Sequence, residues 1–569
     1  MAIENYMIVD GMPVVLDGTE RNLIEVIRKS GVEMPTFCYH TDLSIYGACR
    51  MCMVEDERGR LMASCSTLPY AGMNIKTNSE RLRKYRKNIL ELLLAEHCRD
   101  CTTCSNNGTC HLQSLAIKFN VQNVRFENTH TPEELAIDDS SPCIIKDPGK
   151  CILCGDCVRE CNEIQAVGAI DFAFRGSKCQ IATSFNQPLI ESPCVGCGQC
   201  AAACPTGAIV VRDNRNIVWD ALYDKDTYVT CEIAPAVRVA IGRALGVPET
   251  ANSMGKIVAA LHRMGFDEVY DTCTGADLTV IEEANELVER INSGEKLPLF
   301  TSCCPAWVQF VEKKYPEFLP NVSTCKSPMS MFASLIKTYQ KENDIAPGKK
   351  YYHVAIMPCT AKKYEAQRDE FKTDGQPDTD IVITTQELIK MIRESGILFD
   401  QLPAESVDMP FGEMSGAAVI FGVTGGVTEA VLRKISEDNS RATMNALAYV
   451  GVRGFDGIKE ATVMHRDREV KIAVASGLAN AEKLLKGIKS GELHYDIVEV
   501  MACPGGCISG AGQPYLSRVE RMERGKTLYE ADRTMPVKRS QDNPLMDKLY
   551  DGILKNRTHE LLHVEYKRK

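Results

Sequence analysis

The 569-residue sequence lacks any apolar run of the roughly 18 residues that a membrane-spanning helix needs. Its first 13 residues contain neither the basic nor the apolar segment of a secretory signal. The net charge of −10 leaves no basic excess for a phosphate-binding face, which argues against nucleic acid as a partner. We therefore expect a cytoplasmic chain with no membrane span and no nucleic-acid partner.

Nucleotide-binding motifs are also absent. No GxGxxG stands behind a strand-like run, and Gly422-Val423-Thr424-Gly425-Gly426 lacks the lysine of a P-loop. The sequence therefore predicts no nucleotide site on this chain.

Cysteine, in contrast, is abundant: the chain has 26, and many fall in CxxC clusters. A chain of this length forms several domains with cores of their own, unlike the small secreted domains that depend on disulfides. We therefore expect reduced, metal-bound cysteines in a low-oxygen setting.

Residues 1–78 carry the first cysteine group. A hairpin-like start and an amphipathic stretch from Asn22 to Ser30 precede it, and its members are Cys38, Cys49, Cys52 and Cys65. Two of these cysteines are closely spaced, and the other two are separated from them by long segments, which suits loops around a [2Fe-2S] cluster. The first spacing is longer than in plant-type ferredoxins. Zinc is the alternative.

Residues 79–130 begin with a charged, Leu-rich stretch that predicts a helix from Ser79 to about Asp100. The helix delivers His97, which is followed by Cys101, Cys104 and Cys110. One histidine and three cysteines can hold zinc or a [4Fe-4S] cluster. The neighbouring cluster motifs favour [4Fe-4S].

Residues 131–213 contain the run CxxCxxCxxxC twice, which is typical of bacterial two-cluster ferredoxins. In that pattern each fourth cysteine binds the other cluster. We expect one [4Fe-4S] cluster on Cys151, Cys154, Cys157 and Cys204, and a second on Cys194, Cys197, Cys200 and Cys161. Electron transfer is the common use of such a pair.

Residues 214–569 alternate strand-like and helix-like runs, which indicates α/β architecture with parallel sheets. One strand-like run ends at Ile420-Phe421, and one helix-like stretch runs from Gln386 to Glu394. Ligands bind at the carboxyl ends of strands in such sheets. Three cysteine loops stand at predicted strand ends, and they offer Cys304, Cys359, Cys503 and Cys507 as a four-thiolate cage with Cys303 and Lys362 beside it. The cage requires that the fold bring the loops together.

Three segments resemble the signatures of the [FeFe]-hydrogenases: TSCCPAW (301–307), MPCTAKKYE (357–365) and EVMACPGGCISGAGQP (499–514). The resemblance extends over the whole chain, because residues 1–213 are similar to the accessory domains of larger members. It implies an α/β catalytic domain of two lobes with the cofactor between them. A β-grasp [2Fe-2S] domain, a small His/Cys3 [4Fe-4S] domain and an α+β two-cluster ferredoxin domain would precede it.

The resemblance implies an H-cluster, which is a [4Fe-4S] cube joined through Cys507 to a two-iron unit with CO, cyanide and a dithiolate amine. Cys304, Cys359 and Cys503 would be the other ligands of the cube. Three accessory [4Fe-4S] clusters and one [2Fe-2S] cluster are implied upstream. The two-iron unit requires maturation proteins.

Cys303 would pass protons to and from the bridging amine in such an enzyme. An unperturbed thiol titrates near roughly 8.5, so modest tuning suits it to a relay. The family's path to solvent corresponds here to Glu283, Glu286, Arg290 and Ser323, the first three on one face of a helix expected to begin near Thr279. Without the neighbouring signatures, a Glu/Glu/Arg stripe would indicate a solvated face.

Lys362 would donate a hydrogen bond to a cyanide. The apolar pocket positions are Ala234, Pro235, Met357, Phe421 and Met501. Six further thiols match no ligand position, and we expect them to be buried: Cys98, Cys143, Cys179, Cys231, Cys273 and Cys325. The chain departs from the best-known members at Ala306, Pro504, Ala511 and Met329.

The predicted reaction is the reversible reduction of protons to H2. With Ala306 and Pro504 at these positions, the chain resembles the catalytic subunits of NAD(P)-linked and electron-bifurcating complexes. The NAD(P) couple would then require a flavin-bearing partner subunit. A stand-alone enzyme that exchanges electrons with ferredoxin is the alternative. A hydrogen sensor, an iron–sulfur assembly protein and a subunit of a respiratory dehydrogenase are further alternatives. The sensor is disfavoured by the presence of Cys303 and by a tail too short for a signalling domain, and the dehydrogenase subunit leaves the three signatures unexplained.

Overall fold

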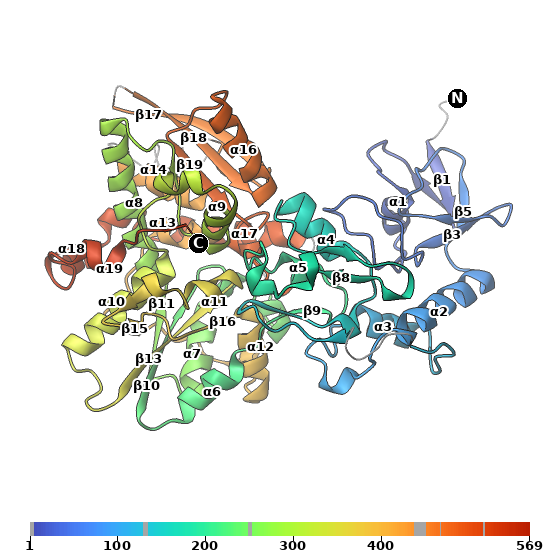
Figure 1. The fold of residues 1–569 in the computed structure, drawn as a ribbon, viewed down its shortest axis with the longest axis horizontal. Helices are drawn as coiled ribbons and strands as arrows, with labels where there is room; N and C mark the ends of the chain where they lie inside the picture. The colour runs from blue at the N-terminus through green and yellow to red at the C-terminus, as the bar shows by residue number, and fades with distance from the viewer. Residues whose placement is uncertain are drawn as a thin grey trace. The chain divides into compact units, whose positions relative to one another are not determined.

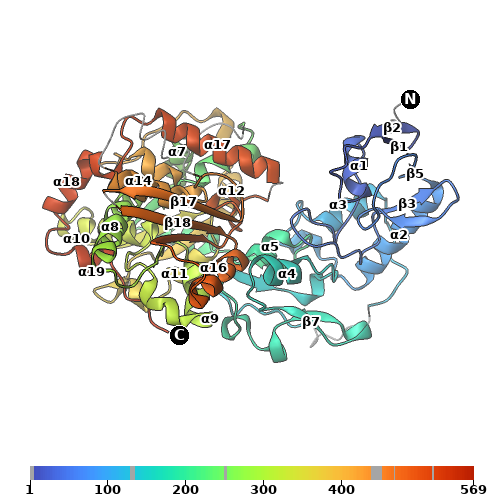
Figure 2. The same ribbon diagram turned by 90° about the horizontal axis from the view of Figure 1, so that it is seen from above.

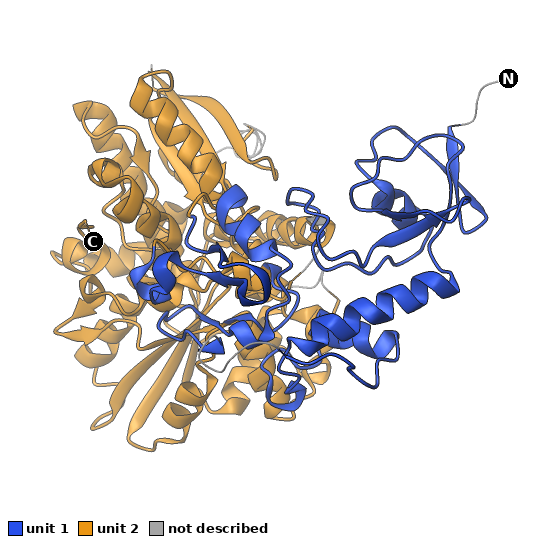
Figure 3. Cartoon of the chain, turned by 45° about the vertical axis from the view of Figure 1, so that its right-hand side comes forward, with its two compact units in different colours: residues 1–164, 168–192, 203–210 blue, residues 165–167, 193–202, 211–569 orange. Residues whose placement is uncertain are grey.

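The structure, a computed structural model, describes residues 5–128, 135–248, 253–436, 451–466, 468–515 and 518–568. The chain forms two compact units, coloured separately in Figure 3. Unit 1 comprises residues 1–164, 168–192 and 203–210, and unit 2 comprises 165–167, 193–202 and 211–569. The last change of unit, after residue 210, lies near the domain boundary expected at residue 213.

Unit 1 opens with a five-stranded sheet in the order β2-β1-β5-β3-β4 (Figure 1). Its strands are β1 (Tyr6–Val9), β2 (Met12–Val15), β3 (Met53–Asp56), β4 (Leu61–Ala63) and β5 (Asn74–Lys76). The expected amphipathic helix is α1 (Leu23–Lys29), which begins at Asn22 because that side chain accepts a hydrogen bond from the Glu25 amide. Four buried aliphatic residues of α1 pack on the sheet.

The next part of unit 1 is helical. Helix α2 (Glu80–Ala95) begins at Ser79, whose side chain accepts from the Leu82 amide, and it ends just before His97. Helix α3 (His111–Lys118) follows the last cysteine of the His/Cys3 group. The remaining elements are short: β6 (Ile144–Lys146), α4 (Asp156–Arg159), β7 (Asp171–Ala173), β8 (Gln180–Ala182) and β9 (Ile209–Val211).

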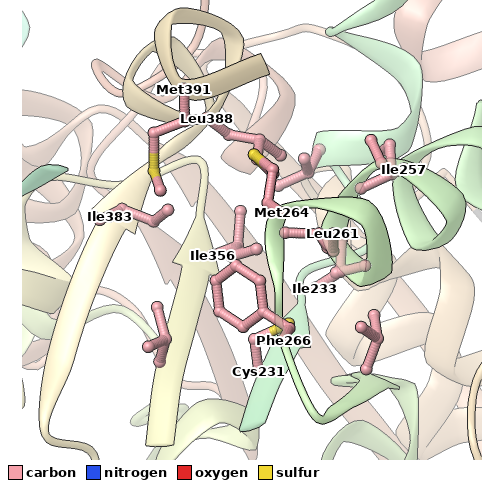
Figure 4. Close-up of a cluster of buried hydrophobic side chains, with 14 of the residues drawn as sticks. Cys231, Ile233, Ile257, Leu261, Met264, Phe266, Ile356, Ile383, Leu388 and Met391 are labelled. Carbon is pink, nitrogen blue, oxygen red and sulfur yellow. The ribbon is translucent and has the colours of Figure 1, made fainter. Parts of the chain in front are cut away.

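Unit 2 contains two four-stranded sheets. The first has the order β11-β10-β13-β16 and is parallel throughout: β10 (Thr227–Ile233), β11 (Glu268–Asp271), β13 (Lys350–Met357) and β16 (Ile381–Thr384). One face packs on α7 (Met254–Met264) and α12 (Thr385–Glu394), as the side chains from β10, β13 and these helices show in Figure 4. The opposite face meets α10 (Pro328–Glu342).

The second sheet has the order β12-β19-β18-β17: β12 (Leu299–Phe300), β17 (Ile458–His465), β18 (Arg468–Ser476) and β19 (Ile497–Met501). One face packs on α9 (Pro305–Lys314) and α16 (Leu478–Ser490), and the other on α8 (Cys273–Ser293) and α14 (Gly426–Ile435). Figure 2 shows β17 and β18 with α14 and α16 on either side. The β17–β18 pair is antiparallel, so this sheet is mixed and not purely parallel as expected.

Other helices complete unit 2: α5 (Gln199–Ala203), α6 (Arg215–Tyr223), α11 (Ala361–Glu365), α13 (Gly416–Val419), α17 (Arg518–Thr534), α18 (Pro544–Asp551) and α19 (Thr558–Leu562). Two very short strands, β14 (Lys372–Thr373) and β15 (Gln376–Pro377), pair with each other. Within the described ranges no helix is long and apolar enough to cross a membrane.

Two local predictions were wrong. The apolar run ending at Phe421 is not a strand: α13 continues into a 3-10 turn over Ile420–Gly422, because small residues let this segment pack among helices. Helix α8 begins at Cys273, not near Thr279, and the Thr279 hydroxyl donates to the carbonyl of Gly275 inside the helix. Glu283, Glu286 and Arg290, which are predicted to belong to the proton path, therefore lie ten or more residues after the start of a long helix.

The glycine-rich loop before α14 also has a structural explanation. Glu499 on β19 accepts hydrogen bonds from the Gly425 amide (2.6 Å), the Thr428 amide (2.8 Å) and the Thr428 hydroxyl (2.9 Å). A fixed carboxylate therefore satisfies the helix N-terminus that in a nucleotide site would bind phosphate.

Candidate active site and cluster sites

One cavity in unit 2 collects the residues of the three cysteine loops. It is lined by Cys303, Cys304, Cys359, Cys503 and Cys507, together with Lys362. The five predicted pocket residues also line it: Ala234, Pro235, Met357, Phe421 and Met501. The fold thus brings together positions that are up to 273 residues apart in sequence (507 − 234).

Strand ends position these cysteines. Cys303 and Cys304 follow β12, Cys359 follows β13, and Cys503 and Cys507 follow β19. The turn between the last two requires glycine, because a Cβ on Gly506 (φ +92°) would lie 2.5 Å from the Thr424 amide nitrogen. Gly510 is similarly constrained, since a Cβ there would lie 2.2 Å from the carbonyl oxygen of Pro358.

The cavity wall is largely apolar, so it disfavours free charge. Burial raises the pKa of Cys503 well above its ordinary value and that of Cys359 to about 12. Because the four thiols surround one apolar space, a negative charge on one disfavours ionisation of the others. A positively charged iron–sulfur core would stabilise all four thiolates, so this arrangement fits such a core. The residues present therefore fit the cluster that the sequence predicts.

Lys362 is the cation of this site. Its Nζ donates to Ser327 Oγ (2.6 Å) and pairs with Glu365 at 2.6 Å. Burial lowers the pKa of Lys362, but the Glu365 charge outweighs that effect and keeps the pKa above its ordinary value. Lys362 is therefore a fixed positive charge at the cavity wall.

A line of polar residues leads from Cys303 along α8. Glu283 is fully buried, and burial together with the charge of Glu286 raises its pKa to about 8. Glu286 accepts from Ser323 Oγ at 2.7 Å and from Arg290 at 2.5 Å. Burial, and then the neighbouring Glu283, raise the pKa of Cys303 well above its ordinary value. The structure therefore brings all five predicted path residues into one neighbourhood.

The loop of the second ferredoxin-like motif reaches the cavity loops within unit 2. Gln199 Nε2 donates to Cys503 Sγ at 3.0 Å and to the Ser509 carbonyl at 3.2 Å. Thr360 Oγ1 donates to the Gly196 carbonyl at 2.7 Å. Cys194, Cys197 and Cys200 therefore lie on a loop held against the Cys503 and Cys359 turns. Their pairing with Cys161, which belongs to unit 1, stays a prediction.

A second cavity, in unit 1, is lined by Cys151, Cys154, Cys157 and Cys204. These are the four cysteines predicted to share one [4Fe-4S] cluster, including the one contributed by the second motif. The His/Cys3 group packs beside it: the His111 amide donates to the Pro205 carbonyl (2.9 Å), and a Cβ on Gly207 would lie 2.8 Å from Cys104 Sγ.

His97 is prepared to be a ligand. Its Nδ1 accepts from the Arg99 amide at 3.1 Å, whereas its buried Nε2 has no hydrogen-bond partner among the described residues. Burial lowers the pKa of His97, so the imidazole is neutral, as metal binding requires.

The first cysteine group is packed in two pairs, Cys38 with Cys49 and Cys52 with Cys65. The Cys49 amide donates to Cys38 Sγ at 3.3 Å, and the Phe37 amide donates to Cys49 Sγ at 3.4 Å. One apolar cluster includes Cys38, Cys110 and Cys154, with Cys49 packed against it. Three predicted cluster sites of unit 1 therefore meet at one apolar cluster.

The six thiols without a ligand role are not all buried as expected. Cys143, Cys231, Cys273 and Cys325 are buried, whereas Cys98 is exposed and Cys179 is half-buried. Cys98 follows the end of α2, where its amide donates to the Gly149 carbonyl and leaves the side chain outside the core. The prediction was wrong for Cys98, because periodicity cannot locate a side chain in a loop.

Sequence reasoning missed several residues of the cavity and its surroundings. Thr272, Ala276 and Gly422 line it, and Ser327, Glu365 and Gln199 hold its charged and sulfur groups. Met329, noted only as a departure, lines it too. The start of α10 after Ser327 was a readable signal, because Ser-Pro is a common helix N-terminus.

Comparison with known families agrees with this site. Residues 227–511 match the family "Iron only hydrogenase large subunit, C-terminal domain", and residues 518–569 match "Iron hydrogenase small subunit". Residues 7–80 match a 2Fe-2S cluster binding domain, 86–125 the NADH-ubiquinone oxidoreductase-G iron-sulfur binding region, and 150–208 a 4Fe-4S dicluster domain. The small-subunit match in the tail was not foreseen.

Three individual proteins are similar to this chain over most of their own length. The chain is 42% identical over 562 residues to the NADP-reducing hydrogenase subunit HndD of Solidesulfovibrio fructosivorans, covering 96% of each chain. It is 35% identical to iron hydrogenase 1 of Clostridium pasteurianum, covering 98% of this chain and 100% of that one. It is also 30% identical to the cytosolic iron-sulfur assembly component 3 of Mus musculus over 66% of this chain and 82% of that protein.

Solved structures are similar as well. An [FeFe]-hydrogenase HydA structure that concerns stepwise H-cluster assembly has a TM-score of 0.54 and 37% identity, covering 63% of this chain and 99% of that one. A single-residue variant of [FeFe]-hydrogenase HydA1 from Chlamydomonas reinhardtii has a TM-score of 0.54 and 36% identity over the same shares.

The cysteine-lined cavity and the matched iron–sulfur domains define an oxidoreductase that carries electrons to an enclosed metal centre. The chain belongs to the iron-only, or [FeFe]-, hydrogenase family. It has the catalytic domain of that family together with 2Fe-2S and 4Fe-4S ferredoxin-like domains.

Proposed function

We propose that this chain interconverts protons, electrons and H2 at an H-cluster held in the unit 2 cavity, as the catalytic subunit of an NAD(P)-linked or electron-bifurcating complex. One observation carries this proposal: five cysteines and a fixed lysine line a single apolar cavity. When bound, the H-cluster supplies the iron at which the H–H bond is made or broken. Cys304, Cys359, Cys503 and Cys507 would hold its cube, and Cys507 would also hold the two-iron unit with its CO, cyanide and dithiolate amine.

The apolar wall excludes water from this space. Ala234, Pro235, Phe421 and Met501 contribute it from three separate segments. Lys362 lines the same space, and its ammonium would offset the negative charge of four thiolates and cyanide. A dry, fixed environment of this kind strengthens each electrostatic contact and avoids reorganisation during turnover.

Protons would reach the cavity through Cys303. Glu283 is neutral near pH 7, because its pKa is about 8, so it can give a proton to the neighbouring thiol and regain one from the Ser323 and Glu286 side. Arg290 fixes Glu286, with further hydrogen bonds to the Asn321 and Val322 carbonyls. A carboxyl between two acceptors can pass protons in both directions, as a reversible reaction needs.

Electrons would enter through unit 1. Its β-grasp-like sheet would hold one [2Fe-2S] cluster, and three [4Fe-4S] clusters would follow, on the His/Cys3 group and the two ferredoxin motifs. The shared apolar cluster around Cys38, Cys110 and Cys154 supports short distances between sites. The reduced thiols that such clusters need favour the cytoplasm.

The electron partner divides two versions of the proposal. An NAD(P)-linked complex requires a flavin- and nucleotide-binding subunit, and the relative named NADP-reducing hydrogenase subunit supports this version. A stand-alone enzyme would use ferredoxin alone. Purified chain mixed with reduced ferredoxin, and separately with NADH or NADPH, distinguishes them: high H2 output from ferredoxin alone overturns the obligatory complex.

An infrared spectrum tests the metal centre itself. After expression with maturation proteins, the purified chain should show CO and cyanide bands and evolve H2 from a strong reductant. Bands without any turnover would instead support a sensor. A matured sample without the bands would overturn the H-cluster proposal.

A further inference from the structure

A second buried acid stands behind the cavity wall, on the side of the first sheet. Glu232 on β10 is completely buried, and one carboxyl oxygen lies 3.4 Å from His353 Nε2 on β13. The other oxygen has no hydrogen-bond partner among the described residues. Thr272, which lines the cavity, lies beside this carboxyl, and its buried hydroxyl also has no bonded partner there. The polar groups therefore run from the cavity to Thr272, Glu232 and His353.

His353 is the last polar group of this series, and its imidazole is uncharged. It is completely buried, its Nδ1 lies 3.0 Å from Thr230 Oγ1, and burial together with nearby Lys337 lowers its pKa to about 3. The imidazole is therefore neutral, and it can share one hydrogen with Glu232 but cannot store a second proton as a cation. Storage in this network falls to the carboxyl.

The surroundings of Glu232 determine whether its carboxyl group is protonated. Burial, the largest effect, raises its pKa well above the ordinary value, and Glu365 and Asp271 act in the same direction. Thr272 and the ammonium of Lys362 favour the ionised form. The acid therefore rests protonated, and its anion would find a cation at the cavity wall once the proton leaves.

An entirely structural role does not explain this arrangement. A buried polar atom without a partner destabilises the fold, and here a carboxyl oxygen and a hydroxyl lie side by side without a hydrogen bond between them. Among the described residues Glu283 of the proposed path likewise has no hydrogen-bond partner at either oxygen, whereas two other buried acids of unit 2 are satisfied. Glu499 uses both oxygens at a helix N-terminus, and Asp277 accepts from Ser415 and Asn543.

We propose that Glu232 is a second proton store of the active site, which exchanges its proton with the cavity through the Thr272 hydroxyl. In the forward step the O–H bond of Glu232 breaks, Thr272 Oγ takes that proton, and the proton of Thr272 moves to an acceptor on the cofactor. One proton is transferred, no electron passes through these residues, and the reverse step restores both O–H bonds. Each sheet of unit 2 thus supplies one protonatable group, Cys303 after β12 and Glu232 on β10.

This inference rests on the proposed function, because the acceptor is part of the bound cofactor. The test is an infrared difference spectrum of the matured enzyme between its oxidised and H2-reduced states, recorded in H2O and in D2O. We expect a band of a protonated carboxyl group that is lost on reduction and shifts in D2O. Glu232→Gln should abolish the band, and Glu283→Gln should retain it.

Thr272→Val keeps the acid but removes the hydroxyl link, so the band should then be present in both states and vanish from the difference spectrum. Asp277→Asn, which changes a buried acid whose partners do not include Thr272, should leave the spectrum as in the unmodified protein. The proposal is overturned if Glu232→Gln preserves the band, or if a chain that evolves H2 has no such band. Absence of H2 turnover and CO bands in the unmodified chain would instead overturn the proposed function.

Discussion

The side-chain amide of Gln199 donates a hydrogen bond to the sulfur of Cys503 over 3.0 Å. Gln199 belongs to the CxxCxxCxxxC loop and Cys503 to the loop after β19, 304 residues away. An electron-transfer motif therefore contacts a ligand of the proposed cube directly, and the same residue binds the carbonyl of Ser509.

We expect Gln199→Leu to lower the reduction potential of the cube. An N–H group directed at a cluster sulfur stabilises the more negative, reduced state, and its loss disfavours reduction. A lost contribution of about 1.4 kcal/mol corresponds to roughly 60 mV for one electron. Redox titration followed by electron paramagnetic resonance measures the change. Gln386→Leu is the control, because Gln386 donates to the Ala511 and Gln513 carbonyls and not to sulfur. Equal potentials in both variants would contradict the expectation.

Cys303→Ala should retain the CO and cyanide infrared bands but lower H2 turnover by about 10²–10⁴-fold, since a positioned proton donor typically contributes that much. Cys231→Ala removes another buried thiol of the same unit, which packs in the apolar core of the first sheet, and should leave turnover within a small factor. Turnover retained in Cys303→Ala would remove this residue from the proton path.

Glu283 should make the folded state less stable as the pH rises. Its pKa is raised from 4.5 to about 8 in the folded protein, chiefly by burial. Its stabilising contribution is therefore complete below pH 4.5 and is lost as the pH rises through about 8. Glu283→Gln should flatten this decline in denaturant unfolding measured across that range. Glu289→Gln, at an exposed position of the same helix, should not. Parallel pH profiles of the unmodified chain and Glu283→Gln would show that the pKa of Glu283 is not raised in the folded protein.

Glu499→Gln should destabilise unit 2 by about 1–3 kcal/mol, because one amide nitrogen replaces an oxygen that accepts bonds at the start of α14. Thermal unfolding of the matured protein provides the measurement. Glu492→Gln, an exposed change on the loop before β19, is the matched control. A loss no larger than that of the control would mean that the loop before α14 is held by other contacts.

The sequence was informative where chemistry depends on local spacing. The two CxxCxxCxxxC runs predicted four cysteines around one site, and Cys151, Cys154, Cys157 and Cys204 do line one cavity. The helices α1 and α12 were also found, because their apolar periodicity lies within a few residues of the chain. The apolar run at Phe421 misled, since a short apolar run is equally compatible with a strand and with a buried helix.

The sequence by itself thus determined the class of the protein, the cysteines predicted as ligands and the order of its iron–sulfur motifs, because thiolate spacing directly limits which metals can bind. Only the tertiary structure decided that Ser327 and Glu365 fix Lys362, that Gln199 contacts Cys503, and that Glu232 lies behind Thr272. These residues come from distant segments, and nothing local marks them. They meet because parallel strands direct their ends to one edge of each sheet, where packing and not spacing selects the neighbours.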